Sequence, residues 1–107
     1  MTARERLLDR RLAETFELEV DGLHYTCTVG RYFNGRVGEV FLQNHKVGSH
    51  SDFNARDAAV AASLALQFGC PLEVLQHALL RDAQGNASTP LGAALVRIAK
   101  ADAGRTP

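Results

Sequence analysis

The sequence predicts an α+β fold, in which a three-stranded antiparallel meander is followed by three helices in a single domain. Two patterns predict this class. Apolar residues alternate with polar ones at the period of a strand up to residue 43, and they recur at helical spacing after it. Tight-turn dipeptides separate the predicted strands, whereas glycine and proline separate the predicted helices. At 107 residues, the chain has the length of one domain.

The first 13 residues lie ahead of this pattern. They carry four arginines and three leucines at helical spacing, which predicts either a short amphipathic helix or a frayed arm. The α+β domain itself is expected at residues 14–100. Residues 101–107 are expected to fray as a C-terminal tail.

The three strands are predicted at residues 16–20, 23–29 and 37–43. The dipeptide Asp21-Gly22 joins the first two strands, because it favours the tight turn of a hairpin. A second turn signal, Asn34-Gly35, precedes the third strand. These signals together predict a meander in which sequential strands are neighbours.

The central helix is expected to begin at Asn54, a good N-cap residue, and to run to about Phe68, where Gly69 stops it. Pro71 then opens a second helix at its first turn, and the Thr-Pro pair at 89–90 opens a third. A polar loop separates these last two helices.

The central helix is unusually apolar. When it is drawn at the helical period, its polar sector holds only Arg56, Ser63 and Gln67. Leu64 and Leu66 are predicted to belong to the core. Two interpretations remain open: the domain buries this helix completely, or a second copy of the chain covers part of it.

A homodimer or higher oligomer is the favoured interpretation. A stripe of alanines on the helix would allow close backbone approach. Phe41 is expected on the sheet face turned away from the core, because side chains alternate across a strand. The predicted contact residues are Phe41, Ala58, Ala61, Ala62 and Ala65.

The loop before the central helix is the candidate ligand site. It offers a cation, a glycine amide and a hydroxyl next to the unpaired amides of a helix N-terminus, a combination that attracts a phosphate-bearing small molecule. It lacks the glycine-rich order of a P-loop, and a plain solvated connection is the alternative. The predicted ligand-binding residues are Lys46, Gly48, Ser49, Asn54, Arg56 and Asp57.

Asp57 also allows a structural interpretation. It lies three residues after Asn54, close to the spacing of a capping box. It is either an N-terminal cap partner or a half-buried carboxylate paired with Arg31 or Arg36. Of these two interpretations, capping is favoured.

Composition excludes several classes of function. Twelve basic and twelve acidic side chains cancel, which argues against general binding of nucleic acid or of an anionic membrane. The longest apolar run, residues 58–62, is too short to cross a bilayer, and no export signal is visible. We therefore expect a cytoplasmic protein in which Cys27 and Cys70 are free thiols.

No catalytic residue, metal ligand or cofactor is predicted. His24 should face away from Cys27 on the same strand, and His45 and His50 lie in an irregular loop, so no zinc geometry follows. No serine or cysteine has a predictable histidine and acid beside it.

Several short segments of the chain resemble the TSCPD-domain family, which includes the C-terminal region of cobalamin-dependent (class II) ribonucleotide reductases and small stand-alone bacterial and phage proteins. The resemblance extends from residue 15 to 98, although the Thr-Ser-Cys-Pro-Asp string of the family name is absent. The segments that carry it are GEVFL at 38–42, KVGS at 46–49, RDAA at 56–59, SLALQFGCPLE at 63–73 and ASTPLG at 87–92.

The resemblance implies an accessory module of a reductase. Ribonucleotide reduction needs a large barrel, a cobalamin pocket and several cysteines, which two cysteines in 107 residues do not supply. The leading hypothesis is a non-catalytic, oligomerising module that acts with itself or another protein, beside a nucleotide-metabolic enzyme or in a phage. The alternative is a binder of a phosphate-bearing, nucleotide-like ligand at the loop before the central helix.

Overall fold

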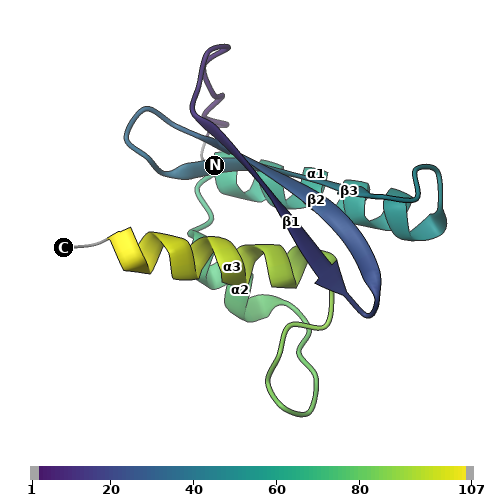
Figure 1. Cartoon of the computed structure of the whole chain (residues 1–107). Helices are drawn as coiled ribbons and strands as arrows, with labels where there is room; N and C mark the ends of the chain where they lie inside the picture. The colour runs from purple at the N-terminus through teal and green to yellow at the C-terminus, as the bar shows by residue number, and fades with distance from the viewer. Residues whose placement is uncertain (1–2, 106–107) are drawn as a thin grey trace.

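The structure, a computed structural model, describes residues 3–105 and confirms the predicted fold class. Three strands form one antiparallel sheet in the order β1-β2-β3, and three helices follow (Figure 1). The elements are β1 (Ala13–Val20), β2 (Leu23–Arg31), β3 (Val37–Asn44), α1 (His50–Gln67), α2 (Leu72–Ala78) and α3 (Pro90–Arg105).

The hairpin between β1 and β2 has the turn that the sequence predicts. Asp21 and Gly22 both have positive φ angles, 52° and 77°, as a two-residue turn matched to the twist of the strands requires. Val20 therefore pairs with Leu23, and the register places Phe16 opposite Cys27.

The core lies on one face of the sheet. Tyr25, Cys27 and Val29 of β2 point to this face, together with Val40 and Leu42 of β3. Helix α1 runs along β3, whereas α3 lies by β1 with α2 packed against it (Figure 1). The helical side of the core consists of Ala55, Ala59, Ala62, Leu66, Leu91, Ala94, Leu95 and Ile98.

The N-terminal segment is an extended arm, and residues 3–12 contain no helix. Its backbone joins the rest of the fold, since the Glu5 N–H donates to the Gln67 carbonyl at 2.8 Å. The Tyr32 hydroxyl donates to the Glu5 carbonyl, and Arg11 pairs with the buried Glu39. Two of its four arginines thus hold the arm against the fold: Arg4 donates to Gln67 of α1 and Arg11 pairs with Glu39 of β3.

Helix α3 continues to Arg105, past residue 100 where the sequence suggested that the ordered domain ends; residues 106–107 lie outside the described part of the chain. An ion pair stabilises this extension: Arg31 donates to Asp102 at 2.9 Å and to Glu14 at 2.7 Å. Burial lowers the pKa of Arg31, but these carboxylates outweigh it and raise the pKa above its usual range. A buried arginine thus ties β2 to β1 and α3.

Helix α1 begins four residues before the predicted start, so the assignment of Asn54 as N-cap is wrong. The N-cap is Ser49, whose hydroxyl accepts the Asp52 N–H at 3.1 Å. Ser49 and Asp52 have the spacing of a capping box, which was the available sequence signal. Asn54 instead lies exposed within the helix.

The prediction for Leu66 is confirmed, and the one for Leu64 is wrong. Leu66 is 3% exposed and packs in the core, whereas Leu64 is 39% exposed. The two residues lie on different sides of α1. The side of the helix next to the edge of β3 carries polar residues instead, and this orientation turns Leu64 outward.

We expect Leu66→Ala to lower the free energy of unfolding by about 2–5 kcal/mol, because it leaves a cavity in the core. Leu64→Ala, the matched control on the same helix, should change it by about 1 kcal/mol or less. Urea unfolding at low protein concentration measures both, since self-association then adds little. Equal losses for the two variants would contradict the orientation of α1.

Candidate functional site

Polar side chains of α1 form hydrogen bonds to backbone groups at the outer edge of β3. The Ser63 hydroxyl accepts the Val40 N–H at 2.9 Å and donates to the Val40 carbonyl at 3.1 Å. One helical turn further on, the Gln67 amide donates to the Gly38 carbonyl at 3.0 Å. The edge of a sheet presents unpaired backbone groups, and here the helix satisfies them with side chains.

Asp52 extends this capping to the end of the strand. Its carboxylate is fully buried and accepts the Asn44 N–H and the Gly48 N–H, each at 3.0 Å. The Gly48 amide holds the pKa of Asp52 below its usual value. Burial opposes this shift, and the Asn44 amide and the nearby Arg56 support it. Asp52 is therefore an anion that the fold itself encloses.

This carboxylate occupies the position in which the sequence suggested a bound phosphate. The Gly48 N–H is hydrogen-bonded to Asp52, and the Ser49 hydroxyl donates to the Lys46 carbonyl at 2.8 Å. Of the three predicted loop residues, Gly48 contacts this internal anion, whereas Lys46 and Ser49 contact each other. Phosphate binding there stays a prediction, and the buried negative charge weighs against it.

Neither structural interpretation of Asp57 holds. It lies exposed on α1, well after the N-cap at Ser49. Its candidate partners are engaged elsewhere: Arg31 pairs with Asp102 and Glu14, and Arg36 pairs with Glu5. The capping interaction that Asn54 and Asp57 suggested is formed five residues earlier, by Ser49 and Asp52.

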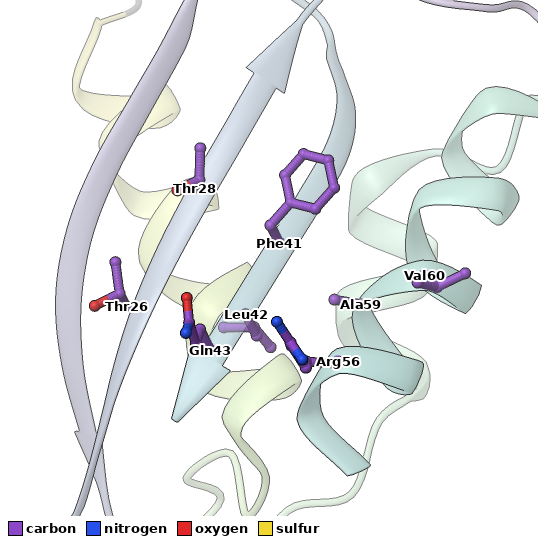
Figure 2. Close-up of a pocket in the computed structure, with 8 residues that line it drawn as sticks. All are labelled: Thr26, Thr28, Phe41, Leu42, Gln43, Arg56, Ala59 and Val60. Atoms are coloured by element: carbon purple, nitrogen blue, oxygen red, sulfur yellow. The ribbon is translucent and has the colours of Figure 1, made fainter. Parts of the chain in front are cut away.

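A cavity of about 340 Å³ opens where β3 and α1 meet (Figure 2). Phe41 and Gln43 reach it from β3, and Arg56 and Val60 reach it from α1. Arg56, predicted as a ligand residue of the loop, thus lies beside this cavity. The remaining lining residues are Thr26, Thr28, Leu42 and Ala59.

The side of α1 turned away from the sheet carries a row of exposed apolar side chains. We define the outer face of α1 as Phe53, Val60, Leu64 and Phe68, all of which are exposed. The predicted alanine stripe is divided between environments. Ala62 is buried in the core of its own domain, Ala61 is exposed, and Ala58 and Ala65 are half-buried.

The open face of the sheet carries one polar cluster that the sequence did not reveal. His45 Nε2 lies 2.8 Å from Glu17 Oε2 and 3.2 Å from Thr26 Oγ1, and the His24 ring stacks on the His45 ring. A catalytic triad uses opposite imidazole nitrogens for the hydroxyl and the acid, whereas here one nitrogen contacts both. The cluster is therefore a surface hydrogen-bond network. Its members come from three separate segments, which sequence spacing could not bring together.

The metal-ligating side chains and the cysteines are the remaining candidates for chemistry in the described part of the chain. Residues 3–105 contain no group of three His, Cys, Asp or Glu side chains that could hold a metal ion. Cys27 and Cys70 are free thiols, as predicted. Burial raises the pKa of Cys27 to about 12, so this thiol stays protonated and is a poor nucleophile.

Comparison with known proteins relates the chain to one class of enzyme. It is similar to the vitamin B12-dependent ribonucleotide reductases of Bradyrhizobium diazoefficiens (38% identity over 73 residues), Agrobacterium fabrum (39% over 70) and Rhodopirellula baltica (39% over 72). The matches cover 65–68% of this chain but only 6–7% of the length of the reductases. The predicted resemblance to a small region of these enzymes is thereby confirmed.

Two further comparisons give no match. No family model matches the chain, and no solved structure matches it significantly, so the TSCPD assignment stays a prediction. Within residues 3–105, no helix is both long and apolar enough to span a bilayer.

We expect Ser63→Ala to lower the free energy of unfolding by about 1–3 kcal/mol, because it leaves the buried N–H and C=O of Val40 without a partner. Ser51→Ala on the same helix is the control and should be nearly neutral. Chemical unfolding measures both variants. A neutral Ser63→Ala would show that the edge of β3 does not depend on this cap.

The Asp52 carboxylate should make the protein acid-sensitive. The pKa of Asp52 is lower in the folded state than in the unfolded chain. The carboxylate therefore stabilises the fold at pH values above its pKa in the unfolded chain, and this stabilisation is lost as the pH falls through its lowered pKa in the folded state. The melting temperature of the wild type should fall more steeply than that of Asp52→Asn between neutral pH and about pH 2. Parallel curves for the two proteins would contradict this role.

Proposed function

We propose that this protein is a non-catalytic, self-associating accessory module that acts beside a cytoplasmic ribonucleotide reductase. Its relation to a small region of vitamin B12-dependent ribonucleotide reductases supports the accessory role. The matched region is only 6–7% of those enzymes, which leaves most of an enzyme of that kind outside it. The observation that carries self-association is the apolar outer face of α1.

This face departs from the usual arrangement for a surface helix. A helix on a globular domain normally turns its apolar residues inward and its polar residues to solvent. In α1 the polar Ser63 and Gln67 are buried against β3, whereas Val60, Leu64 and Phe68 are exposed. A row of apolar side chains on an exposed helix is typical of a protein contact.

The occupant that we propose is a second copy of the chain. Asp57 lies among the apolar residues of the outer face, and Arg56 precedes it. Two copies of α1 packed antiparallel about a twofold axis near this point would bring each Asp57 next to Arg56 of the other copy. Such a contact is self-complementary in shape and charge, as a twofold interface requires.

We expect light scattering at micromolar concentration to give a mass twice the 11.6 kDa of the chain. Leu64→Glu should convert the dimer to a monomer with unchanged secondary structure, because it places two buried charges in the proposed contact. Val74→Glu is the matched control: Val74 is an exposed apolar residue of α2, and this variant should stay dimeric. A monomeric wild type, or a dimeric Leu64→Glu, would refute the proposal.

A further inference from the structure

The capped edge of β3 has one open position. In an antiparallel pair, residues two apart turn their backbone groups to the same side. Side chains of α1 hydrogen-bond to the Gly38 carbonyl, the Val40 N–H and the Asn44 N–H. Leu42 belongs to the same series, so its N–H and C=O also face α1, yet no side chain of residues 3–105 hydrogen-bonds to them.

The reason for this opening is the spacing of α1 against β3. Four residues of a helix rise about 6 Å, close to the length of two strand residues. Gln67 therefore hydrogen-bonds to Gly38, and Ser63, one helical turn earlier, hydrogen-bonds to Val40. The next position along this row is Ala59, whose methyl group forms no hydrogen bond.

The cavity described above lies at this opening. Both Leu42 and Ala59 line it (Figure 2). Its volume of about 340 Å³ is within the range of pockets that hold small molecules. An added peptide strand would need a longer free edge, because Ser63 and Asp52 already cap the neighbouring residues. The opening thus suits a compact ligand that offers one acceptor to the Leu42 N–H and one donor to the Leu42 C=O.

Two apolar side chains stand beside the opening. Phe41 of β3 is 51% exposed and Val60 of α1 is 55% exposed, and they come from the two sides of the cavity (Figure 2). An exposed aromatic ring can stack on a planar ligand, and an aliphatic side chain can cover its other side. These neighbours favour a planar ring whose edge carries the donor and the acceptor.

Arg56 supplies a positive charge at the same place. Its side chain is about half exposed and extends from α1 toward Leu42 and Gln43 (Figure 2). The nearest carboxylate oxygen, Asp52 Oδ1, is 3.9 Å away and already accepts the Asn44 N–H. A guanidinium has five N–H donors, so Arg56 retains donors for an anion.

We propose that this cavity binds a small anionic heterocycle whose ring carries an N–H donor next to a C=O acceptor, as in uridine 5′-monophosphate. The ring edge pairs with the Leu42 backbone, the ring lies by Phe41, and the anion pairs with Arg56. This site borders the proposed dimer contact, because Val60 belongs to the outer face of α1 and Arg56 lies next to Asp57 of the other copy in the twofold arrangement. Binding is therefore compared in the Leu64→Glu background, in which that contact is removed.

The test is a titration of the ¹⁵N-labelled protein with uridine 5′-monophosphate at millimolar concentration, followed by amide chemical shifts. We expect the largest changes at Leu42 and Gln43. N3-methyluridine 5′-monophosphate, which lacks the ring donor, and inorganic phosphate, which lacks the ring, should leave these amides unchanged. Uridine, which lacks the anion, should bind more weakly than its monophosphate.

Two variants locate the site. Ala59→Ser places a hydroxyl where Ser63 places one for Val40, so it should cap Leu42 and abolish binding while the protein stays folded. Arg56→Gln should weaken binding about tenfold or more, because it removes a charge-assisted hydrogen bond. Lys46→Gln, which changes the cation of the neighbouring loop, is the control and should bind as the wild type does.

Three results would overturn the proposal. The first is the absence of any shift at Leu42 in the wild type at millimolar nucleotide. The second is a set of shifts centred on residues 46–49 that Lys46→Gln abolishes, which would place an anion site in the loop instead. The third is unchanged binding by both Ala59→Ser and Arg56→Gln. None of these results decides whether the protein dimerises, which light scattering of Leu64→Glu tests.

Discussion

The edge of β3 imposes the constraint on which the rest of the structure depends. A three-stranded sheet has two edges, and unpaired N–H and C=O groups at an edge need partners. Here Ser63, Gln67 and Asp52 supply these partners from one side of α1. The helix must therefore turn its polar side to the sheet, which determines its rotation about its own axis.

Both candidate functional features follow from that rotation. Since the polar residues are used inside, Val60, Leu64 and Phe68 are left on the surface, where they favour contact with a second copy. Since the capping row includes Ala59, the edge stays open at Leu42, and a cavity with a cation beside it lies there. A self-association surface and a ligand site thus have one structural origin.

Buried charges of the domain lie between elements of the fold. Asp52 is buried at the start of α1 with two backbone amides as donors, and Arg31 is buried between two carboxylates. Each buried charge has hydrogen-bonding partners that offset the cost of removing it from water. These charges stabilise the fold, and the half-exposed Arg56 is the cation with donors to spare at the cavity.

The sequence by itself determined the strands, their turns and the three helices, because alternation, Asp-Gly and Asn-Gly turns, and glycine and proline stops are local signals. It also determined the relation to the reductases, because short segments of the chain carry that resemblance. Only the tertiary structure decided the side of α1 that faces inward. Helical periodicity assumes that polar residues face water, so it placed Leu64 in the core and Ser63 outside. The unpaired backbone of β3 reversed this preference, and a partner 23 residues away in the chain is not visible in local spacing.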